Sequence, residues 1–273
     1  MLQRGSIMPD SIRPLGLGEI LNQGISLFRR NFVPLAGSFA AVYLPVQLIL
    51  RLGVGTFPDL PGGMQDMTQE QYAAAMSSIA ATRIVFALIG GTALFIAYMV
   101  AEGVLIHRAA RAYLGESESI GGSPSFGFSR LVPLLLTCLL KGILIGIGLI
   151  LLVAPGIYLL FRYALSTSVV VIEGLTGVKA LERSRKLMAP GIHILQLLML
   201  GAIGALISFA VAVPVGMLGE NILTYVVAAV VQTLVSAFTA TLFVVFYFSA
   251  RCRIDGFDLD RLAESLAARN VPS

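Results

Sequence analysis

The sequence predicts an all-α integral membrane protein: six transmembrane helices in three helical hairpins, each preceded by an interfacial segment on the cytoplasmic side. Hydrophobic residues make up 57% of the 273 residues, charged residues only 12%, and the mean hydropathy is +0.88. A soluble protein has about 25% charged residues. Because six apolar stretches follow one another through short connectors, residues 1–273 are expected to form a single membrane domain.

Each of the six stretches is long enough for a helix to cross, or nearly cross, a hydrocarbon core of about 30 Å. They cover residues 32–55, 83–107, 131–154, 156–173, 191–217 and 223–250. Prolines bracket three regions, at Pro34 and Pro58, Pro133 and Pro155, and Pro190 and Pro214. A proline is tolerated in the first turn of a helix, because its missing N–H would have had no partner there.

The proline brackets predict an internal repeat of three units, at about residues 14–107, 117–173 and 175–250. The alternative is that prolines near span ends are a general feature of multi-pass proteins. In the first unit, residues 17–30 place apolar and polar side chains on opposite helical faces, as in a helix lying in the headgroup layer. Residues 176–188 are similar, whereas 117–130 are rich in glycine and fit less well. A further amphipathic helix is expected at about 257–269.

Basic residues predict the orientation, because they are retained on the cytoplasmic side of a membrane. Threading the six spans in order places nearly all of them on one side: Arg13, Arg29, Arg30, Arg108, Arg111, Arg130, Lys179, Arg183, Arg185, Lys186, Arg251, Arg253, Arg261 and Arg269. Both termini should therefore be cytoplasmic. The opposite loop is acidic, and Thr68 and Gln71 have the spacing of a capping box that would begin a helix there. A plain solvated loop is the alternative.

Five polar residues within the spans are candidates for ligand or ion binding: Arg162, Lys141, Glu102, Glu173 and Gln232. Ionisable groups at membrane depth are costly, so each is a functional candidate. Lys141 and Glu102 could pair across two helices, and Arg162 is expected in the outer half of the membrane. Structural explanations stand beside these: Lys141 could snorkel, Glu173 could cap a helix, and Gln232 could hydrogen-bond a neighbouring helix. Gly142 and Gly146 predict close helix packing.

Five cations are expected to contact anionic lipid: Arg29, Arg30, Arg183, Arg185 and Lys186. They lie on the polar faces of the two amphipathic segments. The net charge of +4 follows membrane sidedness, and no basic face interleaved with aromatic residues indicates a nucleic-acid partner. The expected partners are membrane lipids, with a protein partner or a second copy of the chain as further possibilities.

Parts of the sequence resemble a known family. The matching positions are the run 155–158, Arg162, the run 169–174 and the run 180–184, with 17–21 and 247–251 near the two ends. They resemble the membrane domain of glycerophosphoryl diester phosphodiesterases and related single-domain bacterial inner-membrane proteins. The resemblance implies a six-helix module of the bacterial inner membrane. It does not imply phosphodiesterase activity, since the soluble catalytic domain of those enzymes has no counterpart in these residues.

No catalytic motif, metal-ligand pattern or cofactor motif stands out, so the sequence predicts neither an enzyme nor a cofactor. His107 and His193 are far apart, and HExxH, GxSxG and GxxxxGK are missing. The leading hypothesis is a non-catalytic membrane module that binds or organises lipids or partner proteins. The alternative is a small transporter or channel for an ion or a phosphorylated or lipid-derived solute.

Overall fold

The computed structural model describes residues 14–54, 68–115, 131–189, 191–217, 219 and 221–255, with only the backbone at 51–54. All regular elements in this part of the chain are helical. In order they are α1 (Leu17–Arg30), α2 (Phe32–Val54), α3 (Gln69–Tyr113), α5 (Leu131–Leu151), α6 (Val153–Arg162), α7 (Ser166–Ser168), the π-helix η2 (Val169–Glu173), α8 (Gly177–Leu187), α9 (Gly191–Gly216) and α10 (Ile222–Asp255).

Six of the described segments are long and apolar enough to cross a membrane, which confirms the predicted number of spans. The segments are α2, α3, α5, the stretch from α6 to η2, α9 and α10. Their outward faces carry large exposed apolar side chains, such as Ile150 and Leu206. Such faces suit a hydrocarbon solvent, because lipid tails are as apolar as the side chains themselves.

The second span and the expected outer helix form one continuous helix. α3 has 45 residues and is about 67 Å long, roughly twice the thickness of a hydrocarbon core. Its start is the predicted capping box: the Gln71 N–H donates to Thr68 Oγ1 at 3.3 Å, and the Thr68 N–H donates to Gln71 Oε1 at 3.1 Å. The acidic outer segment is therefore helical from Gln69 onward.

The two amphipathic segments predicted at 17–30 and 176–188 are helices α1 and α8. Pro34 and Pro133 lie in the first turns of α2 and α5, as their tolerance at that position predicts. Pro214, by contrast, lies inside α9 two residues before its end. The segments 117–130 and 257–269, with Pro58 and Pro190, lie outside the described residues, so the repeat stays a prediction.

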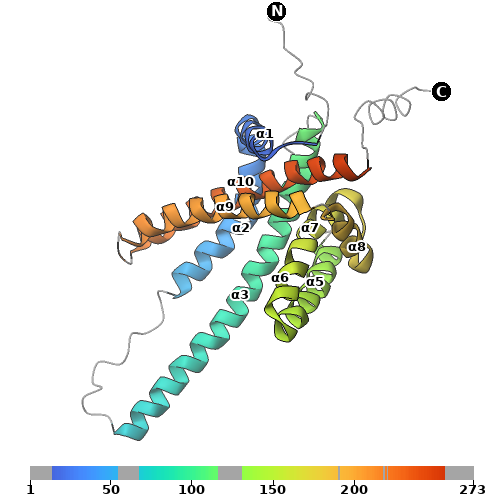
Figure 1. Cartoon of the computed structure of the whole chain (residues 1–273). Coiled ribbons are helices and arrows are strands. Elements are labelled where there is room, and N and C mark those ends of the chain that lie inside the picture. Colours follow the sequence, from blue (N-terminus) through green and yellow to red (C-terminus); the bar gives the residue numbers. More distant parts are fainter. Residues whose placement is uncertain are drawn as a thin grey trace, which may run out of the picture.

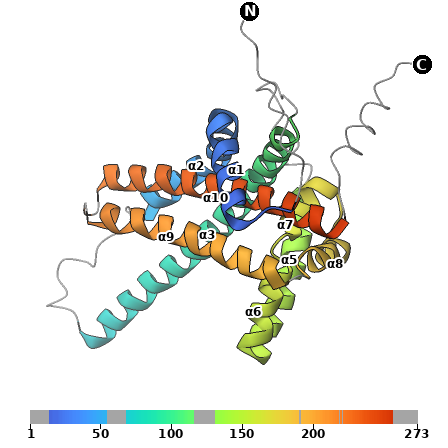
Figure 2. The ribbon, with the colours of Figure 1, turned by 45° about the horizontal axis from the view of Figure 1, so that its top comes forward.

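Helices that are consecutive in the sequence pack in pairs, α2 with α3, α5 with α6 and α9 with α10. The three pairs point in different directions from one end of the molecule, so they do not form the compact six-helix body that a shared axis would give (Figure 1). The turned view shows the same divergence (Figure 2).

The pairs meet in a shared core, which we call the hub. The hub is centred on the second half of α10, where Val244, Val245, Phe246, Tyr247 and Phe248 are at most 1% exposed. Around it pack buried side chains of α1, the start of α2, the end of α3, the segment 165–171, α8 and the start of α9. These are the helix ends for which the positions of the basic residues predict the cytoplasmic side.

The fourth span is not the continuous helix that was predicted for 156–173. α6 ends at Arg162 after ten residues, and the chain turns before it continues as α7 and η2. The break leaves the Arg162 carbonyl without a partner in its own helix, and the Ser184 hydroxyl of α8 donates to it at 3.0 Å. η2 ends at Gly174, whose φ of 73° is the left-handed conformation that favours glycine after a helix.

Candidate functional site

The hub contains a network of charged side chains between η2, α8 and the end of α10. The Arg183 Nε donates to both carboxylate oxygens of Glu173, at 2.9 and 3.1 Å. The other end of the same guanidinium binds the Asp255 carboxylate through Nη1, at 3.0 Å, and Nη2. The Tyr247 hydroxyl donates to Glu173 at 2.6 Å, and Arg251 lies 3.6 Å from Asp255.

This network, which we call the α8–α10 clamp, satisfies its own charges. Glu173 and Arg183 side chains are only 13% and 20% exposed, so their pairing takes place largely away from bulk water. Hydrogen bonds to Asp255 and Glu173 hold the pKa of Arg183 above its usual range. The bidentate geometry on Asp255 is one that arginine can form and lysine cannot. Arg183 therefore connects helices, and its contact with lipid stays a prediction.

Arg162 also makes protein contacts. Its Nη1 donates to the carbonyls of Met188 at 2.8 Å and Arg185 at 3.2 Å, and its Nε donates to the Tyr158 hydroxyl at 2.7 Å. Carbonyls in the last turn of a helix lack partners within the helix, and a cation at that end is stabilising. Arg162 thus caps the C-terminal end of α8.

The sequence did not predict that Arg162 contacts the end of α8, and its predicted place in the outer half of the membrane stays a prediction. Two features bring Arg162 to α8: the break in the fourth span and the packing of α8. α6 rises only about 15 Å before it ends at Arg162. α8 in turn packs against α5, where the Gly177 N–H donates to Thr137 Oγ1 at 2.9 Å.

Glu102 of α3 and Lys141 of α5 are half-buried and close enough to interact electrostatically. No ion pair within 4.0 Å joins these two described side chains, so the predicted contact pair is a longer-range attraction.

Between the two helices, Cys138 Sγ lies 3.3 Å from Met99 Sδ. One turn before Glu102, Tyr98 packs edge-on against Tyr43 with ring centroids 5.8 Å apart.

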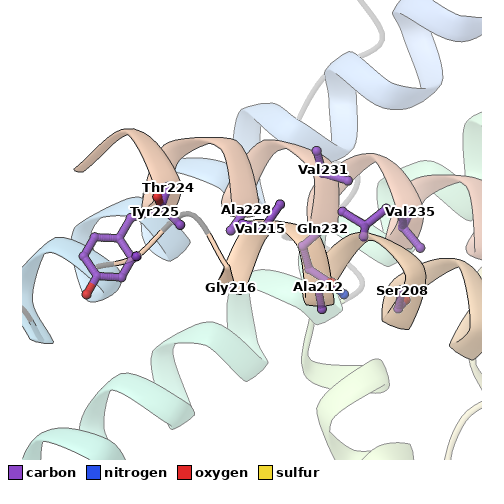
Figure 3. A pocket seen from close by; sticks show the side chains of 12 residues that line it. Ser208, Ala212, Val215, Gly216, Thr224, Tyr225, Ala228, Val231, Gln232 and Val235 are labelled. Atoms are coloured by element: carbon purple, nitrogen blue, oxygen red, sulfur yellow. The ribbon is translucent and has the colours of Figure 1, made fainter. Parts of the chain in front are cut away.

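Gln232 of α10 lines a cavity between α9 and α10. Figure 3 shows its side chain between the two helices, with Ala212 of α9 beside it. Two polar residues near the start of α9 have structural partners. His193 Nδ1 donates to the Leu187 carbonyl at 2.6 Å, and Gln196 Nε2 donates to the Leu15 carbonyl at 3.1 Å.

The remaining four predicted lipid-contacting cations are exposed: Arg29, Arg30, Arg185 and Lys186. Exposed apolar side chains accompany them. Ile25 and Phe32 are 48% and 46% exposed near the end of α1, and Val178 is 60% exposed on α8. Both helices therefore present apolar and basic groups together.

Sequence reasoning missed the glycines that allow the closest helix approach. A Cβ on Gly148 would lie 2.9 Å from Gly156 Cα, and one on Gly156 would lie 2.6 Å from the Leu149 nitrogen. At Gly142 and Gly146 a Cβ would meet nothing within 4 Å, so this predicted packing step faces away from the protein. The packed pair could have been found from the turn at residue 152, because Gly148 and Gly156 lie four residues before and after it.

Sequence reasoning also missed Asp255 and Ser184, since a lone acid after a basic helix end and a lone serine have no distinctive pattern. Within the described ranges, no group of three or more His, Cys, Asp or Glu side chains could hold a metal ion.

Comparison of the chain with models of protein families, with curated proteins and with solved structures finds no match.

Proposed function

We propose that this chain is a non-catalytic, multi-pass module of the bacterial inner membrane that binds or organises anionic lipids at its cytoplasmic surface, with partner proteins as further ligands. In this proposal both termini are cytoplasmic, and the three helix pairs are hairpins that cross the membrane. α1 and α8 lie in the cytoplasmic headgroup layer as interfacial helices.

The observation that carries the proposal is that some cations bind protein groups whereas others are exposed. Arg162 and Arg183 bind carbonyls and carboxylates of the protein, whereas Arg29, Arg30, Arg185 and Lys186 are exposed. Exposed basic groups beside exposed apolar side chains are the combination that binds an anionic membrane surface. Each cation near such a surface contributes about 1 kcal/mol, which is about fivefold in local lipid preference.

The chain contains no tryptophan, so a single introduced tryptophan gives a local probe of lipid contact. Val178→Trp places the probe on α8, seven residues before Arg185 and on the same face. The variant is reconstituted with brominated phosphatidylglycerol or brominated phosphatidylcholine, whose bromines quench a nearby indole. We expect stronger quenching by the anionic lipid, and a loss of this preference in the added double change Arg185→Gln and Lys186→Gln.

Arg83→Gln is the matched control, because it removes an exposed cation from α3 and leaves α8 and its contacts with α10 unchanged. Quenching in this control should equal that of the Val178→Trp parent. Equal quenching by both lipids in the parent, or no change after the double substitution, would contradict lipid recognition by α8.

A small transporter or channel is the second candidate, favoured by Glu102 and Lys141, two half-buried ionisable side chains within the spans of α3 and α5. Ionisable groups held in this way inside a membrane are typical of ion and proton pathways. Liposomes containing the native chain or Lys141→Met would be tested for flux of K⁺, protons, phosphate and glycerol phosphate. A flux that Lys141→Met abolishes would favour transport over the lipid-binding module.

A further inference from the structure

The cavity between the far ends of α9 and α10 is separate from the hub and from the basic helices. Its volume is about 300 Å³, at the lower end of the range for small-molecule sites. Ser208 and Ala212 of α9 line it together with Thr224, Gln232 and Val235 of α10 (Figure 3). Thr224 and Gln232 are eight residues apart, so the cavity extends about 12 Å along the helix.

Two polar groups in the lining lack protein partners. Thr224 is 6% exposed, and its Oγ1 has no hydrogen-bond partner in the structure. Thr137, Thr233 and Thr241 are different, since each donates to the carbonyl four residues earlier. The Gln232 amide likewise makes no hydrogen bond to another described residue, although Gln47, also within a span, accepts one from Thr233.

Unpartnered polar groups in an apolar setting are costly, because water cannot replace the missing hydrogen bond. A ligand that carries two acceptor oxygens would remove this cost at Thr224 and at Gln232. The described lining residues include no charged side chain. None of the described lining residues would pair with a charged ligand, so this lining suits an uncharged ligand better.

We propose that this cavity binds an uncharged amphiphile: a narrow apolar body that carries two or more carbonyl or hydroxyl oxygens. Monoacylglycerols and alkylated quinones share this chemistry. The hydroxyl of Thr224 and the amide of Gln232 would each donate to a different oxygen, because the two residues lie about 12 Å apart along α10. The valine and alanine side chains would contact the apolar body. This site is independent of the basic α8 surface, because it lies at the opposite ends of α9 and α10.

The test uses thermal unfolding of the full chain after removal of bound lipid. Four ten-carbon probes are added: a monoacylglycerol, an alkylated benzoquinone, a fatty acid and an alkyltrimethylammonium salt. We expect the melting temperature to rise by about 3 °C or more with at least one uncharged probe, at a concentration about tenfold above its Kd. The two charged probes should give no such rise.

Gln232→Leu and Thr224→Val remove the two donors at nearly constant volume, and both should abolish the response to the uncharged probe. Ser236→Ala, one turn after Gln232 and outside the lining, is the control and should respond as the native chain does. Equal shifts from charged and uncharged probes, or an undiminished response in Gln232→Leu, would overturn the proposal. The stronger of the two uncharged responses distinguishes an ester lipid from a quinone.

Discussion

Arg183 and Glu173 face each other with the Nε of the arginine 2.9 Å from one carboxylate oxygen and 3.1 Å from the other. Glu173 ends η2 and Arg183 lies in α8, ten residues later in the chain. Because Arg183 also binds Asp255 and Glu173 also binds Tyr247, this contact joins the short helices to the end of α10. The clamp is thus a mechanical link within the hub.

The clamp predicts a large stability difference between two neighbouring arginines. Arg183→Gln should lower the free energy of unfolding by about 2–4 kcal/mol, because it leaves Glu173 largely buried without its cation. Arg185→Gln removes an exposed side chain and should change it by less than about 0.5 kcal/mol. Thermal unfolding followed by loss of the monodisperse chromatographic peak measures both. Equal melting temperatures for the two variants would show that the clamp is not a stabilising contact.

Arg162 should hold the end of α8 in place. Arg162→Met removes both hydrogen bonds to the carbonyls of Arg185 and Met188, so amide hydrogen exchange should accelerate at the end of α8. Tyr158→Phe removes only one acceptor of Arg162 and should have a smaller effect. Exchange measured by mass spectrometry on peptides covering 180–189 makes the comparison. Unchanged exchange in Arg162→Met would refute the capping role.

Two glycine substitutions with the same chemistry should have opposite effects. Gly156→Ala would place a Cβ 2.6 Å from the Leu149 backbone nitrogen, so α6 must move away from α5 and stability should fall by about 1–3 kcal/mol. Gly146→Ala meets open space and should raise stability by up to about 1 kcal/mol through helix propensity. Melting temperatures in one detergent would show the contrast. A gain in both variants would mean that α5 and α6 are not in close contact.

The proposed topology places the start of α3 in the periplasm and α8 in the cytoplasm. In a chain with Cys138 and Cys252 changed to serine, Tyr72→Cys should react with a membrane-impermeant maleimide in cells whose outer membrane alone is permeabilised. Arg185→Cys should react only after the inner membrane is opened. Both positions are exposed in the structure, so access to solvent is not limited by packing. If both cysteines react when only the outer membrane is permeabilised, α8 and the start of α3 lie on the same side, which would contradict the proposed topology.

The sequence predicted the helices well because their determinants are local. Hydropathy marked six spans, the alternating polar face of 17–30 marked α1, and Thr68 with Gln71 marked the start of α3. These signals depend on residues within one helix. They do not say how the helices cross, because lipid solvates diverging helix pairs as well as a compact bundle. They also do not distinguish the exposed Gly142 from the packed Gly148, since both are glycines in the same apolar helix.

The candidate site could be predicted only in part. Arg162 and Glu173 were recognised as unusual charges at membrane depth, yet their partners come from α8 and α10, up to 74 residues away. The break at Tyr163 was not foreseen, since the apolar run 156–173 contains neither a proline after Pro155 nor a polar cluster before Ser166. The hydrogen bond that satisfies the Arg162 carbonyl at this break is tertiary, because its donor is the Ser184 hydroxyl of α8.

The central position of α10 has a consequence for biosynthesis. The ribosome makes this helix after every other described one, yet its second half is what the others pack around. Until it enters the bilayer, α2 can pack with α3 and α5 with α6, but Glu173 lacks Tyr247 and Arg183 lacks Asp255. The shared core is therefore completed only after the last helix has been inserted.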